Sequence, residues 1–76
     1  HMTDDGQPVG YVCPLTADQM RVTKLFAIGL SGKKVAHELK MHEARVARLC
    51  ASACEACGAN NRTHLVAILL RRGWIQ

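Results

Sequence analysis

The central part of the chain reads SGKKVAHELKMHEARVARLCASACEACG from residue 31 to residue 58. Apolar residues recur at helical spacing in this stretch, first at Val35, Ala36 and Leu39 and then along residues 43–57. Ser31 precedes the first of these periods and can cap a helix, and residues 40–42 separate the two periods. The stretch therefore predicts two consecutive helices joined by a tight turn.

Capping residues predict a further helix before this pair. Thr16 with Gln19 three residues later matches a capping box, and Gly29 can end the helix that begins there. The expected helix covers about residues 17–28, and its mostly apolar face includes Leu25.

A last helix is expected over about residues 62–72, between a capping Asn61 and Gly73. Its central run is apolar nearly all round, and a small domain cannot bury every side of such a helix. We expect it to pair two copies of the chain as a homodimer, and the alternative is that one face packs inward while the rest is ordinary exposed apolar surface. The side chains assigned to that interface are Leu65, Val66, Leu69 and Leu70.

The segment before this helical region has no helical period and contains several glycines and prolines. Residues 1–14 are therefore expected to form a flexible N-terminal arm, in which His1-Met2 is typical of a cloning scar. Residues 15–76 are expected to form one all-α domain of four helices, and the start at Met2 favours a standalone protein.

Composition limits the classes of function. The 76 residues carry a net charge of +4, a mild excess that suits an anionic partner. No apolar run reaches the ~18 residues of a membrane span, and no secretory signal is present, so a cytoplasmic protein with reduced cysteines is expected.

Three of the four cysteines lie on one face of the helix expected over residues 43–57. Cys54 and Cys57 fall within about 40° of Cys50 on a helical wheel. Val46 and Ala53 share that stripe, so the cysteines are expected to pack inward as small apolar residues.

Other roles for these cysteines are disfavoured by the sequence. The spacing C-x3-C-x2-C also matches the iron–sulfur motif of radical enzymes that use S-adenosylmethionine, but the segment lacks the glycines and prolines of a loop. A zinc site with His42 or His64 would require buried thiols to ionise. No metal and no cofactor are expected. The protein is not expected to be an enzyme, because the sequence does not place a nucleophile beside an orienting acid.

The opposite face of this helix is small and polar, as suits entry into a DNA major groove. Arg48 is the candidate for a bidentate contact to guanine, although a phosphate contact or a pair with Glu43 or Glu55 is an alternative. The base-facing residues are expected to be Ala44, Ala47, Arg48, Ala51 and Ser52. The phosphate-contacting residues are expected to be Ser31, Lys33, Lys34, Arg45 and Arg62. The alternative for Lys33 and Lys34 is that they only form part of a solvated helix face.

The residues LTADQMRVTKLFAIGLSGKKVAHELKMHEARVARLCASACEACGANNRTHLVAILLRRGWI, numbers 15–75, resemble the LuxR-type (GerE-like) helix-turn-helix domain of bacterial transcription regulators. The most specific pieces are Leu15-Thr16, the turn Gly29-Leu30-Ser31 and the closing GANNRTHLVAILLRRGWI. The resemblance implies a four-helix domain whose third helix enters the major groove and whose fourth helix pairs two copies.

The expected function is that of a transcription regulator that binds double-stranded DNA as a homodimer on a two-fold-related site. One feature favours an alternative. Over residues 41–58, Arg45 and Arg48 are balanced by Glu43 and Glu55, so the expected recognition helix has no net formal charge. Because each lost phosphate contact weakens DNA binding, the domain could instead bind another regulator or RNA polymerase.

Overall fold

The computed structural model describes residues 12–76, so most of the predicted arm at residues 1–14 lies outside the described residues. The described chain is all-helical, as predicted, and has no strand. The helices are α1 (Ala17–Ala27), α2 (Gly32–Leu39), α3 (Glu43–Cys57) and α4 (Arg62–Arg71). Each predicted helix end lies within about a residue of the observed one, the usual uncertainty of a helix boundary.

Side-chain caps explain where three of the helices begin. At α1, the Thr16 hydroxyl accepts a hydrogen bond from the Gln19 amide at 3.2 Å, and Gln19 Oε1 accepts one from the Thr16 amide at 2.9 Å. This reciprocal pair is the predicted capping box. Ser31 caps α2, and Asn61 caps α4 by accepting from the His64 amide at 2.8 Å. All three predicted caps are confirmed.

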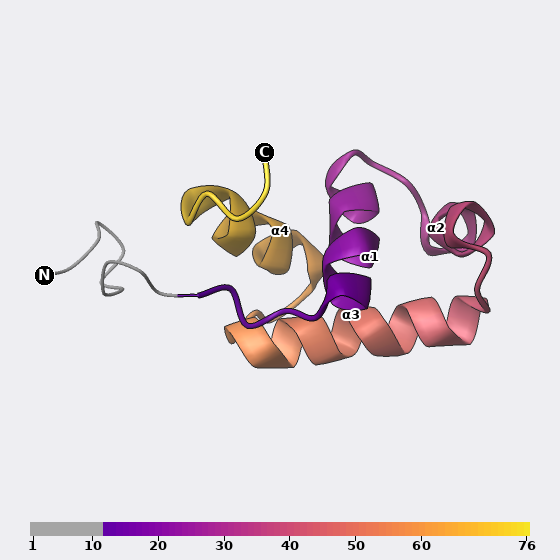
Figure 1. Cartoon of the computed structure of the whole chain (residues 1–76), viewed down its shortest axis with the longest axis horizontal. Coiled ribbons are helices and arrows are strands. Elements are labelled where there is room, and N and C mark those ends of the chain that lie inside the picture. The colour runs from indigo at the N-terminus through magenta and orange to yellow at the C-terminus, as the bar shows by residue number, and fades with distance from the viewer. Residues whose placement is uncertain (1–11) are drawn as a thin grey trace, which may run out of the picture.

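The turn between α2 and α3 is formed by backbone geometry. Lys40 ends α2 in the left-handed conformation at φ 55°, which is uncommon for a residue with a Cβ atom. The Met41 amide then donates a 3.0 Å hydrogen bond to the Ala36 carbonyl, which closes the turn. The chain changes direction sharply within residues 40–42, so α2 and α3 form the tight helix pair that the sequence predicts (Figure 1).

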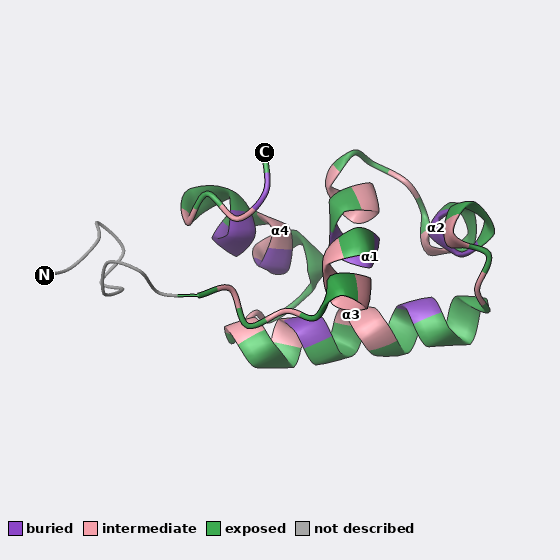
Figure 2. Cartoon of the chain, viewed as in Figure 1, coloured by how far each residue is buried: buried purple, intermediate pink, exposed green. Residues whose placement is uncertain are grey.

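α3 is the scaffold of the molecule. It lies along one side, with α1 across its middle, α2 near its first residues and α4 near its last turns (Figure 1). It contacts each of the other three helices. The face of α3 that points away from these helices is therefore free of helix packing, and exposed residues recur along the length of α3 (Figure 2).

Two groups of buried side chains hold the helices together. The first core cluster is Val22, Val35, Ala36 and Val46, which joins α1, α2 and the start of α3. The second core cluster is Ala53, Leu65, Leu69 and Ile75, which joins the end of α3 to α4 and the C-terminal residues. Val22 is completely buried, although sequence periodicity did not identify it as a core residue.

The structure corrects part of the predicted dimer surface. Leu65 and Leu69 are 0% exposed within one chain, so the prediction that they line a contact between copies is wrong. Both side chains belong to the second core cluster and form the inward, buried face of α4. Leu70 is 49% exposed and Val66 is partly exposed, so these two of the four predicted residues can reach a partner.

No helix among residues 12–76 is long and apolar enough to cross a membrane.

Candidate nucleic-acid interface

The residues predicted to face DNA bases lie together on the outer side of α3. Because α3 has about 3.6 residues per turn, positions 44, 47, 48, 51 and 52 share one side of the helix. All of these side chains are exposed, and four of the five are no larger than serine, so the helix has a shallow outer surface. The residues are Ala44, Ala47, Arg48, Ala51 and Ser52.

Arg48 is the one long side chain in this group. It forms no ion pair or hydrogen bond with another residue in the described part of the chain, and it is exposed. The alternative prediction of a pair with Glu43 or Glu55 is therefore not what the structure has. The Arg48 guanidinium has five donors and can bind a planar acceptor.

Arg45 has a partner within the protein. Its Nη2 lies 3.0 Å from Oδ2 of Asp18 on α1, and the other oxygen of Asp18 contacts Arg21. Both partners of the Arg45 pair are partly exposed, so the pair is worth about 1 kcal/mol or less. Arg45 can therefore exchange Asp18 for a phosphate at small cost.

The start of α2 carries the predicted phosphate contacts Ser31, Lys33 and Lys34, which are all exposed. The Ser31 hydroxyl accepts a 3.3 Å hydrogen bond from the Lys34 amide and so covers one of the free amides of the first turn. Other amides of that turn remain available beside two ammonium groups, and this combination favours an anion.

Arg62, the last of the predicted phosphate contacts, begins α4. Its guanidinium carbon lies 4.2 Å from the centre of the Phe26 ring, at the end of α1. The stacking fixes the direction of an exposed arginine, because a cation is attracted to the face of an aromatic ring. The contact between Phe26 and Arg62 was not predicted from the sequence.

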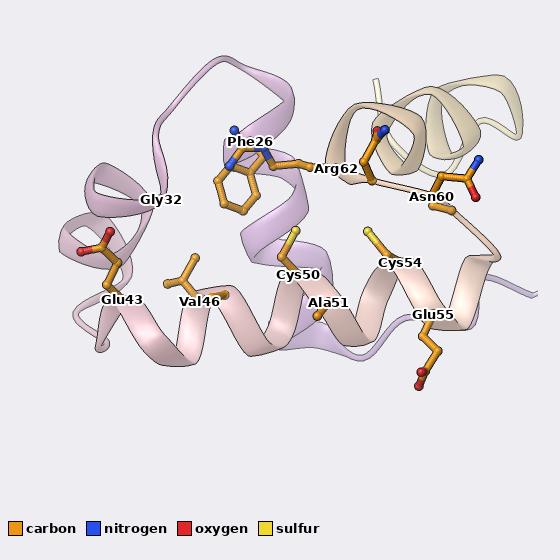
Figure 3. Close-up of a pocket in the computed structure, with 13 residues that line it drawn as sticks. Phe26, Gly32, Glu43, Val46, Cys50, Ala51, Cys54, Glu55, Asn60 and Arg62 are labelled. Atoms are coloured by element: carbon orange, nitrogen blue, oxygen red, sulfur yellow. The ribbon is translucent and has the colours of Figure 1, made fainter.

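A groove of about 670 Å³ runs beside the exposed face of α3. Its floor is formed by Val46, Cys50 and Cys54, and Phe26 and Arg62 lie on the opposite wall (Figure 3). Glu43, Ala47, Ala51 and Glu55 also line it, so the groove is continuous with part of the predicted base-facing surface. Sequence periodicity predicted the inward stripe of α3 but not this opening above it.

The cysteines lie between core and solvent. All four are free and partly exposed, so the predicted inward packing holds only in part. Cys54 and Cys57 pack against the second core cluster, as does Cys13 in the segment before α1, whereas Cys50 belongs to neither cluster. Within residues 12–76, no group of three or more His, Cys, Asp or Glu side chains could hold a metal ion.

Two of the thiols are held in their neutral form. Partial burial is the main cause that raises the pKa of the Cys50 thiol, and the neighbouring Cys54 thiol adds to it by charge and by a hydrogen bond, while Arg62 acts in the opposite direction. Burial also raises the pKa of Cys57, with a further contribution from Cys13. Cys50 and Cys57 therefore contribute little negative charge at neutral pH.

The exposed side of α4 carries an apolar strip. Ala67 and Leu70 are exposed and Val66 is partly exposed, on the side of the helix opposite the buried Leu65 and Leu69. This strip is separate from the outer face of α3, because α4 packs against the other side of α3 (Figure 1).

Neither the known protein-family models nor the curated proteins include a significant match to this chain.

Proposed function

We propose that this chain is a LuxR/GerE-type helix-turn-helix domain that binds double-stranded DNA and regulates transcription. The proposal is supported chiefly by one observation: Arg48 is an unpaired, exposed guanidinium at the centre of an outer α3 surface made of alanine and serine. The proposed function is one of binding rather than of catalysis. We propose that the protein acts in the cytoplasm, where bacterial DNA lies.

Base recognition is assigned to the outer face of α3. Arg48 donates two hydrogen bonds to O6 and N7 of a guanine, the commonest specific contact in a major groove. Ala47 and Ala51 flank it, and their methyl groups allow the helix backbone to approach closely and can contact thymine methyl groups. Ser52 supplies a hydroxyl that can donate to or accept from a base edge.

Phosphate contacts hold the helix in position. Lys33 and Lys34 lie at the N-terminal turn of α2, and Arg62 lies at the N-terminal turn of α4. Backbone amides and the helix dipole favour phosphate at both places. Arg45 can also contact a phosphate once its ion pair with Asp18 is broken. The loss of that ion pair offsets part of the free energy that the phosphate contact contributes.

A homodimer would place two α3 helices on one two-fold-related site. The exposed strip Val66, Ala67 and Leu70 of α4 supports such a contact, in place of the buried Leu65 and Leu69. Dimerisation also compensates for the small core of a chain of this size, since short chains bury a smaller share of their apolar surface.

A second candidate function is recognition of a protein, either another regulator or RNA polymerase. It is supported by the groove of about 670 Å³ and by the two carboxylates at its edge, Glu43 and Glu55, which repel DNA phosphates. These carboxylates cancel the formal charges of Arg45 and Arg48, so they reduce the electrostatic part of DNA binding.

Fluorescence anisotropy of a labelled random duplex, titrated with the full chain at about 50 mM and about 200 mM salt, separates the two candidates. The DNA-binding proposal predicts a dissociation constant of about 10⁻⁴ to 10⁻⁶ M that weakens as salt rises. Absence of salt-sensitive binding over that range would favour protein recognition.

A charge-adding variant sharpens this test. Ala51→Lys adds a cation to the outer face of α3, which is proposed to enter the DNA major groove. It is expected to steepen the slope of log affinity against log salt by about 0.9. Gln76→Lys adds the same charge at the exposed C-terminus, which lies on the side of the molecule away from the outer face of α3 (Figure 1). Equal effects of the two variants would count against α3 as the DNA-contacting element.

A further inference from the structure

Cys50 and Cys54 form a pair of thiols that the proposed DNA contacts do not use. They are one helical turn apart on α3, and both sulfur atoms point into the groove toward Phe26 and Arg62 (Figure 3). Both thiols are partly exposed, and the nearness of the Cys54 thiol contributes to the raised pKa of Cys50. They are therefore adjacent to each other and open to a small solute.

The helix keeps these two thiols from forming a disulfide. Residues i and i+4 of an α-helix have Cβ atoms about 5–6 Å apart, whereas a disulfide requires Cβ atoms about 3.5–4.5 Å apart. Bonding the two sulfurs would therefore distort α3, which every other helix packs against. Insertion of an ion between the sulfurs removes this conflict, because the two sulfurs then no longer have to come within bonding distance of each other.

We propose that Cys50 and Cys54 bind one Cu(I) ion as a two-coordinate bis-thiolate in the groove of α3. Thiolates are soft ligands that select soft ions such as Cu(I), and a d¹⁰ monovalent ion is stable with two sulfur ligands in a line. Structural zinc sites require four ligands. Among residues 12–76 no third side chain of a metal-binding type joins the pair, so the geometry favours Cu(I) over zinc.

The charges around the site fit this assignment. Cu⁺ displaces the proton of each thiol, two protons are released to solvent, and the bis-thiolate that forms has a net charge of −1. The Arg62 guanidinium lies on the opposite wall of the groove, held against Phe26, and it already favours the thiolate form of Cys50. No electron is transferred, because copper is bound as Cu(I) and remains Cu(I).

The other two cysteines provide matched controls within the same chain. Cys13 and Cys57 pack against the second core cluster, and neither lines the groove that holds Cys50 and Cys54. Cys57 opens instead onto a separate hollow beside His64 and Arg71. Substitution at these two positions removes as many sulfur atoms as substitution at Cys50 and Cys54 but leaves the proposed site intact.

The test is anaerobic titration of the full, reduced chain with Cu(I) in competition with a coloured Cu(I) chelator such as bathocuproine disulfonate. Native mass spectrometry gives the number of bound ions, and far-UV circular dichroism checks that each variant remains helical. The Cys13→Ser/Cys57→Ser double variant is expected to retain about one tightly held Cu⁺ per chain, because it keeps both proposed ligands. Cys50→Ser and Cys54→Ser are each expected to lose it, because a hydroxyl is a poor ligand for a soft ion.

Three results would overturn the site: no Cu(I) uptake by the unmodified chain, undiminished uptake by helical Cys50→Ser, or loss of the ion from the Cys13→Ser/Cys57→Ser variant. Cys50→Ser is the deciding variant if Cys54→Ser unfolds, because Cys50 lies outside both core clusters. The measurement needs no DNA, so its outcome is independent of the proposed DNA-binding function.

Discussion

Oδ2 of Asp18 and Nη2 of Arg45 lie 3.0 Å apart and join α1 to α3 across 27 positions of sequence. The pair connects the edge of the proposed DNA-binding surface to the helix that packs behind it. Arg45 is therefore partly neutralised in the free protein, and a phosphate must compete with a carboxylate for its guanidinium.

Replacing Asp18 should make Arg45 available to DNA. Asp18→Asn removes one negative charge and the ion pair, so affinity for any duplex should rise, by up to about 1 kcal/mol. The slope of log affinity against log salt should steepen by up to about 0.9, because one more phosphate can be neutralised. Anisotropy titrations over a range of salt concentrations measure both quantities, and stability should fall by less than about 1 kcal/mol.

Glu38→Gln is the control for this variant, since Glu38 is an exposed acid on α2 that forms no ion pair with another described residue. It changes net charge by the same amount without releasing an arginine. Equal gains in the two variants would show a general effect of net charge, and the role assigned to the Asp18–Arg45 pair would then be wrong.

Arg48 should determine sequence preference. Arg48→Ala is expected to weaken binding to a selected site by about 1–3 kcal/mol. Binding to random DNA should weaken less, because a bidentate contact to guanine is lost only where guanine is present. Lys33→Ala should weaken binding to both duplexes equally, because a phosphate contact does not depend on the base sequence. Selection of duplexes from a random pool, followed by titration of both DNAs, provides the measurement. Equal losses on both DNAs for Arg48→Ala would reassign Arg48 to the DNA backbone.

Two neighbouring leucines on α4 should behave differently. Leu70→Glu places a charge on an exposed apolar strip, so it should separate a dimer into folded monomers. Leu69→Ala removes a completely buried side chain, so it should lower the free energy of unfolding by about 2–5 kcal/mol.

Sedimentation velocity and thermal unfolding, applied to both leucine variants, distinguish surface from core. The proposed α4 interface fails if the unmodified chain sediments as a monomer at high concentration. It also fails if Leu70→Glu sediments at the same rate as an unmodified dimer.

Local signals predicted the helices of this protein well. Thr16, Ser31 and Asn61 cap the helices as expected because a cap depends on residues three positions apart, whose spacing is visible in the sequence. Relationships between distant residues were not predictable in this way. The pairing of Asp18 with Arg45 and the stacking of Arg62 on Phe26 depend on how the helices pack.

The same limit explains the error at Leu65 and Leu69. An apolar run along α4 has no polar face to mark which side turns inward, so periodicity could not separate core residues from surface residues. The cysteine stripe of α3 was placed on the correct side of the helix, but the groove above Cys50 depends on the position of Phe26 and Arg62. The exposure of the residues proposed to face bases was predictable, because the exposed arc of one helix follows from its buried arc.

The reactivity of Cys50 should depend on pH in a manner set by its surroundings. Burial and the Cys54 thiol raise its pKa above the ordinary value of 9.0, so little thiolate is present at neutral pH. Its rate of alkylation by iodoacetamide, followed by peptide mass spectrometry, should still be rising as pH passes 9.0. Arg62→Gln removes a charge that lowers this pKa, so the midpoint of the profile should move to higher pH.

Arg71→Gln serves as the control for the alkylation profile, because Arg71 is not among the groups that act on Cys50. The midpoint, rather than the absolute rate, is the quantity to compare, since loss of Arg62 also uncovers the groove. A midpoint that stays in place or moves to lower pH in Arg62→Gln would contradict the electrostatic coupling across the groove.

Lys40 should be a site where glycine stabilises the fold. Its φ of 55° and ψ of 47° place a residue with a Cβ atom in the left-handed region, which costs about 1 kcal/mol or more. Lys40→Gly removes this strain, and the greater freedom of glycine in the unfolded chain offsets part of the gain. We expect a net increase of about 0.5 kcal/mol in the free energy of unfolding, measured by urea denaturation.

Lys24→Gly is the matched control for Lys40→Gly, because Lys24 is exposed and has helical geometry within α1. This variant should lose about 1 kcal/mol, the usual cost of glycine in a helix interior. The two lysines thus predict opposite signs for the same substitution, and only backbone conformation distinguishes them. A loss of stability in Lys40→Gly comparable to that in Lys24→Gly would mean that the turn between α2 and α3 does not hold Lys40 in a left-handed conformation in solution.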